Sequence, residues 1–303
     1  MPTLERPDCP LCKASAAQEL YRINCQGGEW ESFAKHHAGE EPARKVIIPH
    51  FAGQSFSYLK CKSCSFLWQG CVLDDQGMAD LYARPEDDLG YAESLRAYQT
   101  RSSRQRGTRL AMRVAQTLAR TNANITKVKV LDFGCGFGVW FRMAAAMGAD
   151  CTGVELSEGR RAGMSAAGIR VFKELSDVNE SFDLVLSDQV IEHVVDPVQS
   201  VKELVSKAKP GAVVFLGTPS SRKASSVIRN TAASNTYNPI RPFIHINSFT
   251  NQTLKKIGRI AGLQPIRAQA KYGYHLGVLG SVKNLLANEW DFWTKTAIHF
   301  RKA

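Results

Sequence analysis

KVKVLDFGCGFG, residues 127–138, is the stretch that decides the fold. It begins as an apolar run typical of a buried strand, and from Asp132 it becomes a turn with a glycine at every second position. The glycines are Gly134, Gly136 and Gly138. Glycine has no Cβ, so its backbone can approach a ligand closely at the carboxyl edge of a sheet. A dinucleotide loop would place another glycine at Val139, and Asp132 would repel a pyrophosphate, so a cationic ligand suits this turn better.

The chain around this turn alternates short apolar runs with helical windows. The runs include DCTGVEL (150–156), FDLVLS (182–187) and AVVFLGT (212–218), and a typical window between them is VQSVKELVSKAKPG (198–211). Strands that alternate with helices form parallel βαβ units. We therefore predict an α/β fold with a doubly wound, mostly parallel sheet.

Two further features fit the glycine turn. Glu155 ends the next strand roughly twenty residues later, where an acidic side chain can accept hydrogen bonds from both hydroxyls of a ribose. The block FDLVLSDQVIEHVVDP (182–197) follows. Together these motifs resemble the class I S-adenosylmethionine-dependent methyltransferases, and they are similar to the small-molecule members of the quinone and sugar type. The resemblance covers residues 126–220 and, less closely, HINSFTNQTLKKIGRIAGL (245–263). It implies a seven-stranded Rossmann-like sheet with S-adenosylmethionine as the cofactor.

The same resemblance implies roles for individual residues. Asp132, Gly134 and Gly136, with Gly138 in the same loop, would hold the methionine part of the cofactor, and Glu155 would hold the ribose. The remaining contacts would come from Asp177 near the adenine and from Gln189 and Val190 on the floor between cofactor and acceptor. A surface turn is the alternative interpretation for Asp177.

Two CxxC pairs near the N-terminus predict a metal site. Cys9-Pro-Leu-Cys12 and Cys61-Lys-Ser-Cys64 together offer four thiolates, the set that a closed tetrahedral zinc site requires. A site with four protein ligands has no open position, so its role would be structural or recognitive. Reduced structural cysteines or a redox pair are the alternatives. A similar N-terminal arrangement occurs in the sugar C-methyltransferases.

Few catalytic residues are needed, because the cofactor already carries a good leaving group and the protein mainly aligns and dehydrates the acceptor. If the acceptor is a hydroxyl or an acidic C–H, a base must take its proton. His193, just past the fourth strand, is the first candidate and His245 the second. The alternative for each is a histidine that hydrogen-bonds to backbone or packs against neighbouring residues.

Composition limits the class of protein. The chain has 303 residues, 44% of them hydrophobic, and contains neither a membrane-spanning apolar run nor a signal-peptide core, so we expect a cytoplasmic location. The net charge of +11 arises after residue 221, where 13 Lys and Arg face only two acids. Such a surface can attract an anionic acceptor, phospholipid or nucleic acid, or can simply aid solubility.

We expect four regions along the chain. They are a four-cysteine zinc-binding module at 1–75, a helical connector or lid at 76–125, the S-adenosylmethionine-dependent domain at 126–275 and a basic, aromatic tail at 276–303. For the tail we favour a docked helix over peripheral contact with a membrane. The sequence does not indicate an oligomeric state.

The leading functional hypothesis is methyl transfer to an oxygen or carbon of a small or carrier-linked acceptor, such as a nucleotide sugar, a polysaccharide or a lipid or quinone intermediate. One alternative is an RNA methyltransferase, since a zinc module with a basic surface can also grip RNA. We consider it weaker, because the chain lacks the Asn/Asp-Pro-Pro-aromatic signature of amino-group methylation. Another alternative is an inactive methyltransferase-like scaffold with a zinc-dependent binding module.

Overall fold

The structure, a computed structural model, describes six stretches of the chain. They are residues 3–38, 41–82, 101–121, 123–231, 237–266 and 295–303. Within these stretches no helix combines the length and the apolar character that crossing a lipid bilayer requires.

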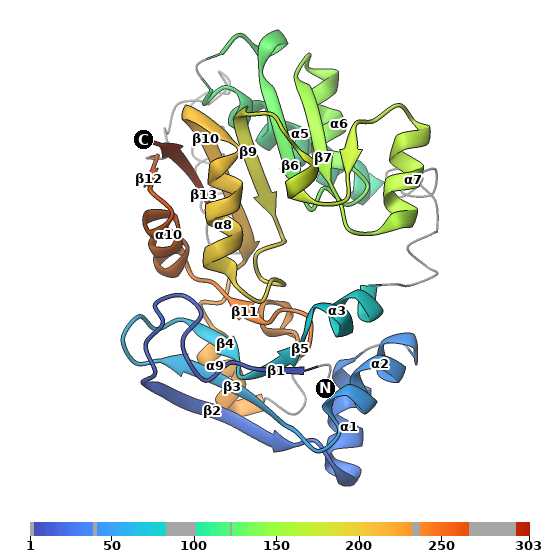
Figure 1. The fold of residues 1–303 in the computed structure, drawn as a ribbon, viewed down its shortest axis with the longest axis vertical. Coiled ribbons are helices and arrows are strands. Elements are labelled where there is room, and N and C mark those ends of the chain that lie inside the picture. Colours follow the sequence, from blue (N-terminus) through green and yellow to red (C-terminus); the bar gives the residue numbers. More distant parts are fainter. Residues whose placement is uncertain (1–2, 39–40, 83–100, 122, 232–236, 267–294) are drawn as a thin grey trace.

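A seven-stranded sheet forms one half of the molecule (Figure 1). Its strands, in spatial order, are β12 (Leu263–Pro265), β13 (Lys295–Lys302), β10 (Ala208–Pro219), β9 (Phe182–Asp188), β6 (Lys129–Phe133), β7 (Asp150–Val154) and β8 (Val171–Phe172). The strands from β10 to β8 are parallel, and β13 is antiparallel to both of its neighbours. The chain moves outward from β6 through β7 to β8 and then returns to β9 on the other side of β6. The doubly wound, mostly parallel, seven-stranded Rossmann-like sheet is therefore confirmed, with its switch point between β6 and β9.

Helices cover both faces of this sheet. They are α5 (Arg101–Leu118), α6 (Val139–Ala146), α7 (Glu158–Ala166), α8 (Pro197–Ser206) and α10 (Asn251–Ile260). α5 and α6 pack on one face, over a buried cluster that includes Val130 and Phe215. α8 and α10 pack on the other face, over a cluster that includes Val185 and Leu216. Alternate residues of each strand thus enter different cores, which explains the continuous apolar runs in the sequence.

The last strand corrects the tail expected at 276–303. Lys295–Lys302 forms a strand between β12 and β10, paired with β10 from Val213 to Pro219, and not a docked helix. Ile298 and Phe300 alternate along the strand and are buried against α10. This is the period of two that a strand requires, within a stretch whose aromatic and basic composition suggested an interfacial helix. Residues 276–294 of the expected tail lie outside the described part of the chain.

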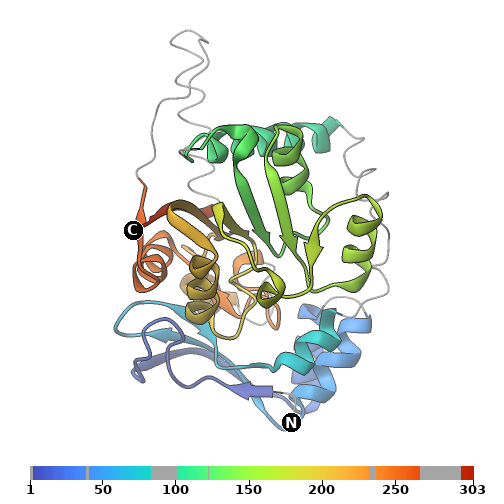
Figure 2. The same cartoon turned by 45° about the horizontal axis from the view of Figure 1, so that its top comes forward.

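A smaller unit, which we call the N-terminal module, is built mainly from residues 3–82 and lies at one end of the sheet in both views (Figures 1 and 2). Its four-stranded antiparallel sheet consists of β11 (Asn247–Ser248), β4 (Leu67–Gln69), β3 (Ser55–Cys61) and β2 (Ala17–Asn24), and a separate pair consists of β1 (Thr3–Glu5) and β5 (Cys71–Leu73). Its helices are α1 (Gly27–His37), α2 (Glu41–Phe51), α3 (Asp75–Tyr82) and α9 (Ala224–Thr231). In α1 the buried residues Trp30, Phe33, Ala34 and His37 follow helical spacing.

The module and the large sheet are joined by shared chain and shared core. β11 and α9 come from the C-terminal half of the sequence, yet β11 pairs with β4 and α9 contacts β2. One buried cluster contains Cys9 and Trp68 from the module together with Val185 of β9. The expected boundary at residue 75 therefore does not separate two hydrophobic cores.

Candidate functional site

The glycine turn follows β6 at the switch point of the sheet. The backbone is left-handed at Gly134, Gly136 and Gly138, with φ of 69°, 57° and 66°. A Cβ on Gly134 would come within 2.4 Å of Cγ2 of Val190, so that position must be glycine for packing. A Cβ on Gly136 would meet no atom within 4 Å. The turn therefore packs tightly against Val190 at Gly134 and leaves room for a ligand at Gly136.

Glu155 lies directly after β7 and faces the same turn. Its side chain is buried, with Oε2 accepting a hydrogen bond from the Gly136 amide at 2.8 Å and Oε1 accepting one from the Ser157 amide at 2.9 Å. Arg160 Nη1 lies 4.0 Å from Oε1. Next to this buried acid, Leu156 is 68% exposed. The carboxylate is therefore oriented by backbone amides beside an apolar side chain that a planar ligand could cover.

Three acidic side chains surround the turn. Asp132 is buried at the end of β6, and burial together with the nearby Asp188 and Glu155 raises its pKa to about 8. Asp188 ends β9, and its Oδ2 lies 3.6 Å from Nη1 of Arg113. Sequence reasoning missed Asp188, although it closes its strand as Asp132 does. Because burial and two neighbouring carboxylates make ionisation of Asp132 costly, the site favours a ligand that carries positive charge.

The structure brings together most of the predicted cofactor residues, but not all. Asp177 is exposed in a short 3-10 turn (Leu175–Asp177), where its carboxylate accepts a hydrogen bond from the Glu174 amide at 3.2 Å. Gln189 is exposed and has a φ of 65°. Its backbone amide donates a hydrogen bond to the Gly217 carbonyl at 2.8 Å. Its neighbour Val190 touches the glycine turn. The roles of Asp177 and Gln189 towards a ligand stay predictions.

The two predicted histidines lie side by side. Their rings are 4.9 Å apart, with 70° between the ring planes. Nδ1 of His193 lies 2.9 Å from the Ile244 carbonyl, and Nδ1 of His245 bonds to the Asn238 carbonyl. A carbonyl only accepts hydrogen bonds, so each Nδ1 must carry a proton, and each neutral ring has its lone pair on Nε2.

Burial sets the charge of this pair. It lowers the pKa of His193 to about 4, and burial together with His193 lowers the pKa of His245 to about 4. Glu192 is buried beside them, with Oε1 3.8 Å from Nε2 of His193, and burial and Asp188 raise its pKa to about 8. At pH 7 the carboxyl group thus keeps its proton and both imidazoles are neutral. A neutral imidazole can accept a proton, as a general base must.

Glu192, His193 and His245 can also be viewed as possible metal ligands, since one ligand atom from each lies within 4.8 Å of the others. Neither carboxylate oxygen of Glu192 has a hydrogen-bond partner in the described part of the chain. A buried acid without partners is costly, so it marks a position that a proton or a ligand completes.

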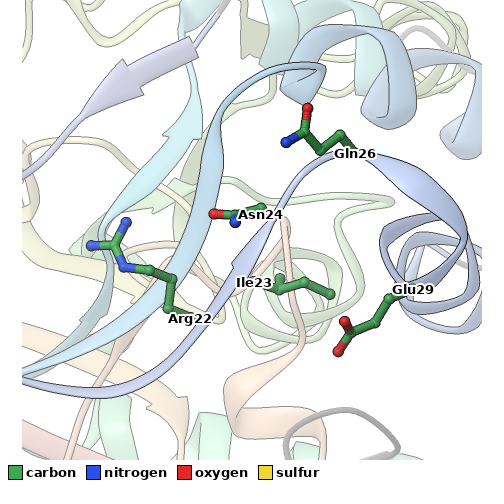
Figure 3. Close-up of a pocket in the computed structure, with 5 residues that line it drawn as sticks. All are labelled: Arg22, Ile23, Asn24, Gln26 and Glu29. Atoms are coloured by element: carbon green, nitrogen blue, oxygen red, sulfur yellow. The ribbon is translucent and has the colours of Figure 1, made fainter.

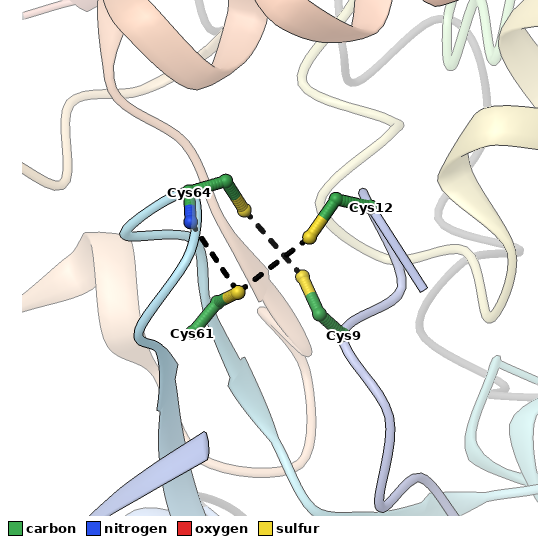
Figure 4. A group of neighbouring side chains, drawn as sticks. All are labelled: Cys9, Cys12, Cys61 and Cys64. Atoms are coloured by element: carbon green, nitrogen blue, oxygen red, sulfur yellow. Dashed lines mark hydrogen bonds between the residues drawn. The ribbon is translucent and has the colours of Figure 1, made fainter. Parts of the chain in front are cut away.

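The four predicted cysteines converge in the N-terminal module (Figure 4). Sγ of Cys9 lies 3.6 Å from Sγ of Cys64, Sγ of Cys12 lies 3.5 Å from Sγ of Cys61, and all four sulfur atoms are within 4.8 Å of one another. A tetrahedron with Zn–S bonds of about 2.3 Å has edges of about 3.8 Å, whereas a disulfide would need about 2 Å. The cluster therefore has the donors and the dimensions of a four-cysteine zinc site.

The two CxxC turns share one local geometry. The residue after each pair, Lys13 or Ser65, is left-handed, with φ of 59° and 60°. Its amide donates to the carbonyl of the first cysteine, at 2.8 Å in one turn and 3.0 Å in the other. Equivalent turns aim two thiolates at one point, as a metal knuckle requires.

A polar hollow of about 440 Å³ lies elsewhere on the N-terminal module, along the end of β2 and the start of α1 (Figure 3). Its lining residues are Arg22, Ile23, Asn24, Gln26 and Glu29. Arg22 already pairs with Glu19 at 2.7 Å. None of these residues belongs to the predicted sites, and the hollow adds nothing to their chemistry.

Comparison with known proteins identifies relatives of the larger part of the chain. Residues 102–268 match a family described as "Methyltransferase domain", which is more than half of the sequence. A ubiquinone biosynthesis O-methyltransferase from Rhizobium leguminosarum bv. trifolii (strain WSM2304) is 33% identical over 119 residues, 36% of this chain and 47% of that protein. One from Bordetella pertussis (strain Tohama I) is 32% identical over 113 residues, 33% of this chain and 46% of that protein. The chain thus spans about half the length of the curated relatives it matches.

A solved structure agrees on the fold. Magnesium protoporphyrin IX methyltransferase from Synechocystis PCC 6803, with bound S-adenosylhomocysteine, is 14% identical and has a TM-score of 0.51. The match covers 76% of this chain and all of that one. At this identity the likeness is one of architecture.

Proposed function

Because this chain belongs to the methyltransferase domain family, we propose that it transfers the methyl group of S-adenosylmethionine to an oxygen or carbon of a small or carrier-linked acceptor. The relatives that it matches in part are named as O-methyltransferases of ubiquinone biosynthesis, which favours an oxygen acceptor. Whether the acceptor is a quinone precursor, a nucleotide sugar or another anionic molecule is a separate, finer proposal. The basic residues after position 221 favour an acceptor with phosphate or carboxylate groups.

The acidic glycine turn is the observation that carries this proposal. S-adenosylmethionine brings an ammonium group, a sulfonium and a ribose, and when bound it supplies an activated methyl group. Asp132 and Asp188 would offset the positive charges, and Glu155 would accept hydrogen bonds from the ribose hydroxyls. The open space at Gly136 allows the ligand to lie against the backbone.

His193 would act as the general base on the acceptor side. The side chain of His193 is 22% exposed, whereas that of Glu192 beside it is 1% exposed. An acceptor can therefore reach His193 but not Glu192. The carbonyl of Ile244 holds the proton on Nδ1, which orients the lone pair of Nε2. Nε2 would take the proton of an acceptor hydroxyl, and the bound cofactor would supply the methyl group and leave as S-adenosylhomocysteine.

We also propose a structural zinc ion on Cys9, Cys12, Cys61 and Cys64. Four thiolates close the coordination shell, so this metal would stabilise the module and would not take part in the chemistry. Thiolates stay reduced in the cytoplasm, where we expect the protein to act.

Calorimetric titration tests the cofactor. The protein should bind S-adenosylmethionine and S-adenosylhomocysteine but not a nicotinamide dinucleotide. Gly136→Val should abolish binding, because its side chain would occupy the ligand space. The matched control is Gly168→Val, since Gly168 also has a positive φ (74°) and no atom within 4 Å of a Cβ, but lies after α7. A wild-type chain that binds neither adenosyl compound would instead support the scaffold alternative.

A further inference from the structure

One segment of the chain holds both histidines in place. It runs from Asn238 to Ile246, contains the 3-10 turn Asn238–Ile240 (η4), and supplies the two carbonyls that bond to the imidazoles. After η4 it has no regular structure until β11, and Phe243 within it has φ of 67°. A backbone without regular structure lacks the repeating hydrogen bonds of a helix or sheet, so its conformation depends on contacts with other parts of the protein.

Gln69 of the N-terminal module provides several of those contacts. Its side chain is fully buried, and Nε2 donates to the Arg241 carbonyl at 3.2 Å and to the His245 carbonyl at 3.1 Å. Oε1 accepts a hydrogen bond from the Phe243 amide at 3.0 Å. One amide side chain thus joins three residues of the segment, on either side of the carbonyl that orients His193.

Aromatic side chains of the module also hold the ring of Phe243, which lies at the centre of the segment. Phe243 is buried among aromatic side chains of the module, with centroid distances of 5.8 Å to Trp30, 5.2 Å to Phe51 and 5.1 Å to Phe56. The Phe243 amide that bonds to Gln69 is therefore fixed from both sides. Apolar packing of Phe243 determines how deeply the segment is buried. The directional hydrogen bonds of Gln69 determine where its carbonyl groups point.

We infer that Gln69 is a positioning residue for the general base: it fixes the segment whose carbonyls hold the Nδ1 protons of His193 and His245, and so aims Nε2 of His193 at the acceptor. This inference rests on the proposed methyl transfer, in which His193 accepts the acceptor's proton. It assigns to the N-terminal module a part in the acceptor site, beyond that of a metal-stabilised appendage. Gln69 itself is fully buried, so it would act on the acceptor only through this segment.

The side chain of Gln69 is separable from the strand that carries it. The backbone amide of Gln69 bonds to the Ile246 carbonyl, and Trp68 pairs with Asn247 in the β4–β11 ladder. A substitution at Gln69 keeps these backbone bonds. It removes only the side-chain bonds to the segment between η4 and β11.

The test uses Gln69→Met in the 303-residue chain, prepared in the presence of zinc. Methionine keeps the length and much of the volume of glutamine but has no strong donor or acceptor. ¹⁵N NMR of the imidazoles, assigned with His193→Gln and His245→Gln, reports the tautomer of each ring. We expect both rings to lose their fixed Nδ1–H tautomer. Turnover should fall by about tenfold, with S-adenosylmethionine affinity within about twofold of wild type.

Gln18→Met is the matched control, because Gln18 is an exposed glutamine on β2 of the same module. It should change none of these readouts. Gln69→Glu is the conservative variant, since a buried, protonated carboxyl group keeps the acceptor for Phe243 and one donor. It should give imidazole signals intermediate between those of the wild type and of Gln69→Met. It replaces Gln69→Met in the experiment if that variant does not fold.

Unchanged tautomers in a folded Gln69→Met protein would overturn the inference. The ring signals do not depend on turnover, so they decide the role of Gln69 even if the reaction is different. Normal turnover in His193→Gln would instead refute the general-base proposal.

Discussion

Binding of S-adenosylmethionine should release a proton from Asp132. In the free protein, burial and the neighbouring Asp188 and Glu155 raise the pKa of Asp132 to about 8, so the carboxyl group is protonated at pH 7. A bound cation favours the ionised form and lowers this pKa towards its ordinary value. The experiment therefore titrates S-adenosylmethionine into the protein at pH 6 and at pH 7.

The magnitude follows from the two pKa values. At pH 7 a carboxyl group with a pKa of about 8 holds about 0.9 of a proton, whereas one with a pKa near 4 holds about 0.001. Binding should thus release about 0.9 proton per cofactor at pH 7 and about one at pH 6. The ionised fraction of Asp132 rises about ninefold between these pH values, and the apparent affinity should rise by the same factor.

Calorimetry in two buffers with different heats of ionisation measures the released protons directly. The pH stays at or below 7 so that the ammonium group of the cofactor remains largely protonated. Asp183→Asn is the control, because Asp183 is an acid of β9 that pairs with Lys209 and belongs to none of the predicted sites. Proton release near zero, with the same affinity at both pH values, would show that Asp132 is already ionised and would refute the electrostatic argument for the site.

Four further outcomes are expected. The purified chain should carry about one zinc ion, and Cys61→Ser should lose it, as metal analysis will show. His193→Ala should lower turnover by about 10²- to 10⁴-fold with cofactor affinity retained. At saturating S-adenosylmethionine, the wild-type rate should stay level from pH 7 to about 5 and fall as pH drops through about 4, because the lowered pKa of His193 keeps its basic form above that value. Gly258→Ala should lower the free energy of unfolding by about 1–3 kcal/mol, since its Cβ would lie 2.3 Å from Cε1 of Phe300 in β13.

Matched variants separate these effects from general damage. Cys71→Ser changes another buried cysteine of the module that is not among the four converging ones, and it should keep the zinc. Gly28→Ala lies in a helix with nothing within 4 Å of the new Cβ, and it should not destabilise the protein. Zinc loss in Cys71→Ser, or full stability in Gly258→Ala measured by urea unfolding, would contradict the structure.

Much of the fold was predictable because its signals are local. Alternating strands and helices, the glycine turn after Asp132 and the Glu155 strand end are all visible within short windows of sequence. β13 was not predictable in this way, because its alternation is short and lies in an aromatic, basic stretch. Its identity as a strand depends on pairing with β10, about 80 residues earlier in the chain.

The sequence by itself determined the residue types of both sites: a glycine turn flanked by acids, and two CxxC turns with the chemistry of zinc ligands. Only the tertiary structure decided which groups meet. It brought Cys9 to Cys64 and Gln69 to His245, 55 and 176 residues apart, and it placed Asp188 beside Asp132. The physical reason is that a sequence window reports the conformation of its own backbone, whereas burial, charge proximity and hydrogen-bond partners arise only when distant segments pack together.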